Sequence, residues 1–325
     1  METDILEQLK PYFERLDSRM SSCFASHMPF INEITGHILF AGGKKVRPLL
    51  TVLSAILCGR EEIDEAYDLA LVPEYLHAAS LLHDDVVDDG KLRRGKPPAY
   101  TIWGNKATVL AGDFLYARAI ELATRFEDIR IARVTAETVA LMSEGEVMQL
   151  LHSKNPDFFD EQTYMDIIYR KTAALISMSC KIGALFAGAD DTRVNALSNY
   201  GLCLGKAFQM IDDLLDYTAD TKEFGKAVGA DLAEGKLTLP LVYGLSIASP
   251  KEKSEIFLIL KKDKHSPEEL AWIKDLLETK GAFKYTKDKA EELIRIGCNG
   301  LDIFGSSETA GILKRLARFV VERRK

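Results

Sequence analysis

The sequence is poor in several features that would define common classes of protein. Only five of its 325 residues are cysteine, and none forms a Cys-x-x-Cys pair, so neither a disulfide framework nor a cysteine zinc site is indicated. No run approaches the roughly 18 apolar residues of a membrane-spanning helix, and the N-terminal METDILEQLKPYFERL has no apolar signal-peptide centre. The net charge of −7 argues against a general nucleic-acid-binding protein. We therefore expect a reduced, cytoplasmic protein with at most peripheral membrane contact.

Signals for β-structure are also scarce. No alternating apolar and polar run is longer than a few residues, whereas residues 122–152, 163–188 and 195–217 repeat apolar side chains at helical spacing. The sequence contains no Gly-x-Ser-x-Gly nucleophile motif and no Gly-x-Gly-x-x-Gly dinucleotide motif. These patterns predict an all-α, single-domain helical bundle, and no candidate protein nucleophile is visible in the sequence.

Two aspartate clusters of the same form stand out inside apolar segments, DDVVD at residues 84–88 and DDLLD at residues 212–216. On a helix, residues four apart share one face, so Asp84 and Asp88 point the same way, as do Asp212 and Asp216. Unpaired carboxylates in such a place repel each other and require a cation. One cluster alone is also typical of a solvated helix face, but two copies favour a site for a hard cation such as Mg2+. We expect the two motifs to lie on facing helices.

Basic segments accompany the clusters. Glycines followed by cations at the start of a helix, as in AGGKKVRP, form an anion site from backbone N–H groups and side chains, although basic residues at helix starts are also common on plain surfaces. Two histidines near the first cluster, His77 and His83, are equally compatible with packing and with function. The candidate anion-binding residues are Lys44, Lys45, Arg47, Arg93, Arg94, Lys171, Thr172, Gln209, Lys226 and Lys236.

The segments HDDVVDDGKLRRGKP, AGGKKVRP and GKAFQMIDDLLDYTAD followed by FGKAVGADLAEGKLTLP resemble the signature blocks of the trans-isoprenyl diphosphate synthases, or polyprenyl synthetases. The resemblance extends from about residue 40 to about residue 245 in the expected order. It implies one polyprenyl synthetase domain over residues 1–325, with a motif core at about 40–245 and peripheral helices at 246–325. Within the family, the sequence is most similar to the long-chain, octaprenyl type.

The resemblance also implies an activity: the Mg2+-dependent, head-to-tail (1'-4) condensation of an allylic diphosphate, farnesyl or shorter, with isopentenyl diphosphate. In that family three Mg2+ ions join the allylic diphosphate to both aspartate motifs, and the enzyme is a homodimer. Carried over to this sequence, the direct ligands are Asp84, Asp88 and Asp212. Asp85, Asp213 and Asp216 are implied as outer ligands. The residues implied to hold the allylic diphosphate are Arg93, Lys171, Thr172, Gln209 and Lys226, and those for isopentenyl diphosphate are Lys44, Arg47, His77 and Arg94. Lys236 is implied to neutralise the departing phosphate.

Product length should depend on what blocks the growing tail beneath the first aspartate motif. Ala79 and Ser80 lie about one turn before Asp84, roughly 6–7.5 Å along a helix, and both are small; Leu76 lies one turn further. Short-chain members of the family often place a bulky aromatic residue here. The sequence therefore predicts a product of hexaprenyl to decaprenyl length, with octaprenyl favoured. The alternative is a floor from another helix, for instance at Met148 or Phe208.

Other functions remain open at this point. The main alternative is a short-chain farnesyl or geranylgeranyl diphosphate synthase. A class I terpene cyclase shares the first aspartate motif but has a different second motif and needs no isopentenyl site. A regulatory subunit of a heteromeric synthase typically lacks the aspartates, although this chain could be the catalytic half of such an enzyme. A helical scaffold would not need the acidic clusters.

The C-terminal segment LKRLARFVVERRK is basic and amphipathic. Such a helix can attach to a membrane surface, which would suit an enzyme with a greasy product. The acidic charge of the whole chain favours a final helix that is packed or solvated instead.

Overall fold

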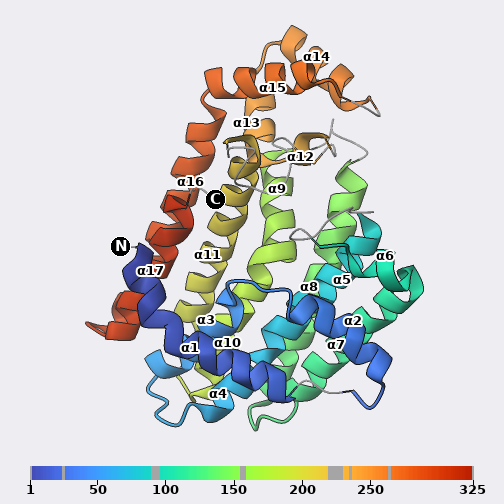
Figure 1. The fold of residues 1–325 in the computed structure, drawn as a ribbon. Coiled ribbons are helices and arrows are strands. Elements are labelled where there is room, and N and C mark those ends of the chain that lie inside the picture. The colour runs from blue at the N-terminus through green and yellow to red at the C-terminus, as the bar shows by residue number, and fades with distance from the viewer. Residues whose placement is uncertain are drawn as a thin grey trace. The chain divides into compact units, whose positions relative to one another are not determined.

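The computed structural model describes residues 2–23, 26–88, 96–153, 159–218, 230–233, 236–262 and 265–323. Every regular element within these ranges is a helix (Figure 1), which confirms the predicted all-α class. None of these helices is long and apolar enough to cross a membrane. The elements are α1 (Glu2–Cys23), α2 (Pro29–Leu39), α3 (Val46–Leu57), α4 (Asp64–Leu69), α5 (Leu71–Val87), α6 (Ala99–Trp103), α7 (Asn105–Ala123), α8 (Ile129–Ser153), α9 (Glu161–Ile168), η2 (Tyr169–Ala173), α10 (Ala174–Phe186), α11 (Asp191–Thr218), α12 (Ala230–Ala233), α13 (Leu239–Ile247), α14 (Pro250–Leu260), α15 (Pro267–Thr279), α16 (Ala282–Gly300), η3 (Leu301–Phe304) and α17 (Glu308–Glu322).

The chain divides into two compact units, each assembled from segments that are far apart in the sequence. The first aspartate motif belongs to the first unit and the second motif to the second unit. The expectations of a single domain and of facing motifs therefore stay predictions. The first unit comprises Met1–Ala140, Leu175–Gly201 and Gly300–Leu316, and the second comprises Leu141–Ala174, Leu202–Asn299 and Ala317–Lys325.

In the first unit, α5 packs closely against α7, and Figure 1 shows α2 beside them. Leu76 and Ala79 of α5 are fully buried. Gly112 of α7 leaves room for the imidazole of His83, which a Cβ at residue 112 would overlap. The Nε2 atom of His83 lies 3.1 Å from the carbonyl oxygen of Val109 and 3.3 Å from Asp113 Oδ1. Of the two readings open for His83, packing against α7 accounts for these contacts, and it fixes the helix that carries the first motif.

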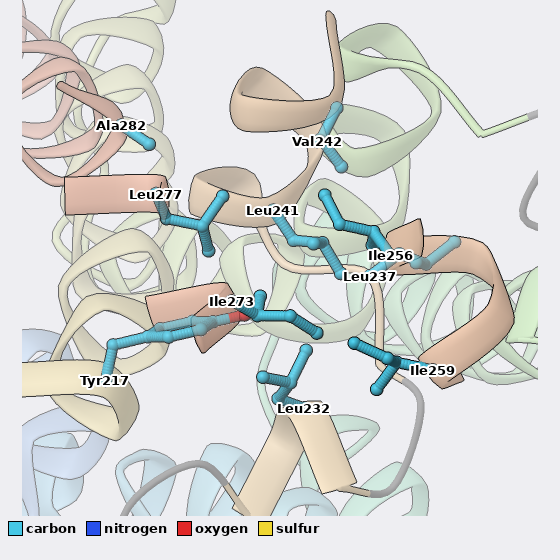
Figure 2. Packing of buried hydrophobic residues seen from close by; sticks show 10 residues of the cluster. All are labelled: Tyr217, Leu232, Leu237, Leu241, Val242, Ile256, Ile259, Ile273, Leu277 and Ala282. Carbon is cyan, nitrogen blue, oxygen red and sulfur yellow. The ribbon is translucent and has the colours of Figure 1, made fainter. Parts of the chain in front are cut away.

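In the second unit, an apolar cluster lies against the end of α11, and Tyr217 projects into it (Figure 2). Tyr217, the residue after the second aspartate motif, is fully buried, and its hydroxyl lies 2.9 Å from Thr238 Oγ1. Helices α13, α14 and α15 supply most of the remaining side chains, so part of the region expected to be peripheral builds the core that supports the motif. The cluster comprises Tyr217, Leu232, Leu237, Leu241, Val242, Ile256, Ile259, Ile273, Leu277 and Ala282.

Two details of the helices differ from the sequence prediction. The helix predicted from residue 122 is interrupted, because α7 ends at Ala123 and α8 begins only at Ile129. The carboxylate of Asp128 accepts the N–H of Arg130 at 2.9 Å, and a side-chain cap of this kind starts a new helix. The predicted helix at 163–188 does end at a glycine, Gly188, with φ of 70°, but it also contains one turn of π-helix, η2, that periodicity does not predict.

Candidate active site

The first aspartate motif lies at the C-terminal end of α5. Asp84 is half-buried and Asp88 is exposed, whereas Asp85 is buried. Asp88 ends the helix, and its N–H donates to the carbonyl oxygen of Asp84 at 2.8 Å. Since residues four apart share a helix face, Asp84 and Asp88 can present carboxylate oxygens to the same ligand while Asp85 points inward.

The glycine-rich segment leads into α3 through residues of positive φ. Gly42 has φ of 82° and Lys45, unusually for a residue with a side chain, has φ of 41°. The ammonium of Lys45 pairs with Asp17 of α1, and burial is the main cause that lowers the pKa of Lys45. Lys44 is exposed and Arg47 is half-buried in the first turn of α3. Lys44 is therefore the most exposed of the three cations of this segment.

His77, the third residue expected to bind isopentenyl diphosphate, is half-buried in α5, about two turns before Asp84. The loop of Lys44 and Arg47 belongs to the same unit, and α3 packs against α5. The first unit therefore contains every described residue that the sequence assigns to isopentenyl diphosphate.

The second aspartate motif lies inside α11, and its three carboxylates have different surroundings. The side chain of Asp212 is 49% exposed and pairs with Arg323 at 3.2 Å. Asp216 is buried, and its Oδ2 atom accepts the N–H of Asp231 at 3.0 Å. Asp213 is also buried. Asp212 is therefore the most accessible carboxylate of the three, and its role as a direct ligand stays a prediction.

A chain of hydrogen bonds joins the second motif to two predicted substrate residues. Thr172 Oγ1 donates to Gln209 Oε1 at 2.8 Å, and Gln209 Nε2 donates to Asp213 Oδ1 at 2.8 Å. The other carboxylate oxygen, Oδ2, accepts the hydroxyl of Tyr164 at 2.6 Å. Burial raises the pKa of Asp213 to about 7, against the opposing hydrogen bonds from Tyr164 and Gln209. Burial likewise raises the pKa of the Tyr164 hydroxyl, so this tyrosine stays a donor.

The π-turn η2 carries Lys171 and Thr172, the cation and the hydroxyl that the sequence assigns to the allylic diphosphate. A carboxylate oxygen of Glu146 on α8 lies 2.6 Å from the ammonium of Lys171. Thr172 is buried and reaches Gln209 on α11. The π-turn therefore brings Lys171 and Thr172 together with Gln209 in the second unit, and all three are predicted to hold the allylic diphosphate.

Lys236 also belongs to the second unit. It follows α12, and its ammonium lies 3.6 Å from Asp231 Oδ1. Because Asp231 in turn donates its N–H to Asp216, Lys236 is linked to the second motif through one residue. Three further predicted residues, Arg93, Arg94 and Lys226, lie outside the described residues.

Sequence reasoning missed three residues of this site. Glu146 is one of three acidic residues of α8, and its sequence context does not distinguish it from Glu137 and Glu144. Tyr164 contacts Asp213 across 49 positions of sequence, and Arg323 contacts Asp212 across 111. No local pattern marks Tyr164 or Arg323, because each becomes a neighbour of the motif only through folding.

The chain-length residues differ in burial. Ala79 and Leu76 are fully buried, whereas Ser80 is half-buried and its hydroxyl donates to the carbonyl oxygen of His77 at 2.9 Å. Of the two small residues, Ser80 is the one that borders accessible space. The ring of Phe208, one alternative floor, is covered by the guanidinium of Arg323 at 4.2 Å.

The oxygen donors of both motifs fit Mg2+, which prefers one or two carboxylates and substrate oxygens. Among the residues that the structure describes, no three His, Cys, Asp or Glu side chains gather into a metal-binding group. The candidate ligands are distributed over the two units, with Asp84 and Asp88 in one and Asp212 in the other.

The helical architecture and its match to solved structures define the class of protein, the all-α isoprenoid synthase fold. A crystal structure of polyprenyl synthase from Caulobacter crescentus CB15, complexed with calcium and isoprenyl diphosphate, matches with a TM-score of 0.91 and 35% identity over 99% of this chain and 97% of that one. The family model described as polyprenyl synthetase matches residues 28–277. The chain belongs to the polyprenyl synthetase family.

Relatives with different products are similarly close. Octaprenyl diphosphate synthase from Escherichia coli is 37% identical over 298 residues, covering 92% of this chain and 91% of the relative. A short chain isoprenyl diphosphate synthase from Methanothermobacter thermautotrophicus is 34% identical over 325 residues, covering 98% and 99%. Overall similarity therefore identifies the family without fixing the product length.

Proposed function

We propose that the protein is a Mg2+-dependent trans-polyprenyl diphosphate synthase. It condenses an allylic diphosphate with isopentenyl diphosphate head to tail (1'-4) and repeats the step to give a long all-trans product. Family membership supports the class of reaction. The observation that carries the proposal is the hydrogen-bonded chain from Thr172 through Gln209 to Asp213. A hydroxyl, an amide and a carboxylate motif thus share one network beside Lys171, which suits a diphosphate that carries metal ions.

The allylic diphosphate binds in the second unit on this proposal. Lys171 donates to a phosphate oxygen as a point charge, and Thr172 and Gln209 fix the orientation of the group. Arg93 and Lys226 are expected to join them. On this proposal the aspartates would hold three Mg2+ ions, with Asp84, Asp88 and Asp212 as direct ligands. When bound, Mg2+ supplies Lewis acidity and positive charge at the leaving diphosphate.

Isopentenyl diphosphate is held by Lys44, Arg47 and His77, with Arg94 expected to contribute. The allylic C–O bond breaks and its electron pair leaves with the diphosphate. The isopentenyl double bond then attacks the allylic carbon, and the proton lost from the adduct passes to the released diphosphate. Lys236 stabilises the departing group. The product is again an allylic diphosphate, so the cycle repeats.

For product length we favour octaprenyl diphosphate. The small Ala79 and the partly accessible Ser80 support a long product, as does the octaprenyl diphosphate synthase relative. The alternative is a short-chain farnesyl or geranylgeranyl product, which the short chain relative supports.

We also propose a cytoplasmic homodimer. Leu110 on α7 is 66% exposed beside the exposed Val109, and apolar surface of this kind suits a subunit contact. Cys58, Cys180 and Cys203 form no disulfide among the described residues, which suits a reducing compartment. Light scattering should give twice the chain mass of 36.2 kDa; the mass of one chain would contradict the dimer.

Pyrophosphate release tests the proposed reaction against a terpene cyclase. Purified protein is incubated with Mg2+ and farnesyl diphosphate, with or without isopentenyl diphosphate. Release that requires both substrates and stops with a chelator is expected. Release from farnesyl diphosphate alone would indicate a cyclase. No release from either mixture by folded protein would contradict the proposed synthase, which acts without a partner subunit, and would leave the catalytic half of a heteromeric enzyme as the alternative.

A further inference from the structure

The segment Glu144-Gly145-Glu146 of α8 lies against the π-turn η2. A Cβ placed on Gly145 would stand 2.8 Å from both the backbone nitrogen of Lys171 and the Cβ of Arg170. Real Cβ atoms do not approach other atoms so closely, so only glycine allows α8 to come this near. The contact brings the two residues flanking Gly145 within reach of the two cations on the turn.

Those two flanking residues are both acidic, and each pairs with one cation. Glu144 pairs with Arg170, and Glu146 pairs with Lys171 at 2.6 Å. The two pairs differ in environment, since the side chain of Glu144 is 59% exposed and that of Glu146 only 18%. Water and salt screen the outer pair far more than the inner pair. The Glu146–Lys171 pair is therefore the one that can hold the side chain of its cation in a fixed orientation.

The opposite side of the π-turn is fixed by α11. A Cβ on Gly205 would lie 2.6 Å from the Cα of Ala173, so the two backbones are in close contact. Thr172 is held by its hydrogen bond to Gln209. The backbone and Thr172 are thus fixed, and the long flexible side chain of Lys171 is the part of the turn that still needs orientation. Turns of π-helix occur frequently at functional sites.

We propose that Glu146 is the residue that positions Lys171 for the allylic diphosphate, an inference that rests on the proposed function. The ammonium has three N–H donors, so it can stay bound to Glu146 and also donate to a phosphate oxygen. The second oxygen of Glu146, Oε1, is buried and has no hydrogen-bond partner among the described residues. Oε1 offers the ammonium a second acceptor on the same carboxylate. The ammonium of Lys171 can therefore rotate toward a phosphate oxygen and stay bound to Glu146.

The test is the variant Glu146→Gln, which keeps the shape and removes the charge. We expect KM for the allylic diphosphate to rise roughly tenfold, as for loss of one charge-assisted hydrogen bond, while KM for isopentenyl diphosphate stays within about twofold. Calorimetric binding of inorganic pyrophosphate should weaken by a similar factor. Glu146→Asp should restore part of the loss, since it keeps the charge. The matched control is Glu144→Gln, which removes the neighbouring exposed pair and should leave both KM values unchanged.

Three results would overturn the inference. The first is an equal change in KM for the allylic diphosphate in Glu146→Gln and Glu144→Gln, and the second is a rise in the KM values of both substrates in Glu146→Gln. The third is tighter pyrophosphate binding by Glu146→Gln, which would mean that Glu146 competes with the diphosphate for Lys171. Thermal unfolding checks that the variants fold, and Glu146→Asp decides the case if Glu146→Gln does not. An inactive wild-type protein would refute the proposed function, whereas pyrophosphate binding would still decide the role of Glu146.

Discussion

Tyr164 shows how a residue outside any motif can govern one inside it. Its hydroxyl donates to one oxygen of the buried Asp213, whose other oxygen accepts from Gln209. The amide oxygen of Gln209 accepts the hydroxyl of Thr172, so the oxygen and the nitrogen of this amide have different partners. The orientation of a predicted substrate residue thus depends on a tyrosine that has no expected contact with substrate.

The variant Tyr164→Phe removes that donor and leaves a buried carboxylate oxygen unsatisfied. We expect a loss of about 1–3 kcal/mol in the free energy of unfolding, together with weaker allylic binding as Gln209 loosens. Urea unfolding and steady-state kinetics measure the two effects. The control is Tyr200→Phe, which removes an equally buried hydroxyl, 2.7 Å from the carbonyl oxygen of Leu313. Tyr200→Phe should lower the free energy of unfolding and leave the kinetics unchanged. A kinetic defect equal to that of Tyr164→Phe would contradict the role of Tyr164.

Asp213 should give the protein a distinctive pH dependence. Burial raises its pKa from 3.8 to about 7, so between these pH values the folded chain binds a proton that the unfolded chain releases. The resulting stability is fully present below about pH 4 and is lost as pH rises toward 7. Measured without metal, the unfolding free energy of the wild type relative to Asp213→Asn should fall by roughly 3 kcal/mol from pH 4 to pH 7. A flat or rising difference would exclude a raised pKa.

Replacing Ala79 by tyrosine should shorten the product, as the sequence predicts. Because Ala79 is fully buried, overpacking should also cost roughly 1–3 kcal/mol. Ser80→Phe, at the partly accessible neighbour, should shorten the product with a smaller loss of stability. Product chromatography and thermal unfolding separate the two effects. Unchanged product length in both variants would move the floor to another helix.

At the scale of elements, the sequence predicted the helices but not their irregular parts. Apolar periodicity identified the segments that became α8, α10 and α11, because their buried faces repeat regularly. It missed the interruption before Ile129, where the carboxylate of Asp128 starts a new helix. It also missed the π-turn, whose extra residue is stabilised by close contacts with Gly145 and Gly205 from other helices. Local periodicity contains no information about such neighbours.

Gly145→Ala tests whether the close approach of α8 matters. Its Cβ would overlap the backbone nitrogen of Lys171, so α8 or the π-turn must shift. We expect a loss of roughly 1–3 kcal/mol in stability, measured by chemical unfolding, and a larger KM for the allylic diphosphate. Gly300→Ala is the control, because a Cβ there meets nothing within 4 Å. That change should be neutral or stabilise the helix by about 0.4–1 kcal/mol; equal effects of the two changes would refute the account.

At the scale of the whole molecule, the two aspartate motifs belong to separate units that interleave along the chain. The sequence predicted both motifs and the cations near them. It could not predict that Arg323, close to the C-terminus, would pair with Asp212. Most apolar residues of α17, including Leu313 and Val320, are buried. This burial favours a packed final helix over the membrane-surface alternative.

Product length with the wild-type protein is the most direct test of the central claim. Purified protein is incubated with farnesyl diphosphate, labelled isopentenyl diphosphate and Mg2+, and the products are separated by chain length. The account predicts products of hexaprenyl length or longer, centred on octaprenyl. A stop at geranylgeranyl would keep the reaction and refute the long product. Absence of incorporation by folded protein with Mg2+ present would contradict the synthase itself.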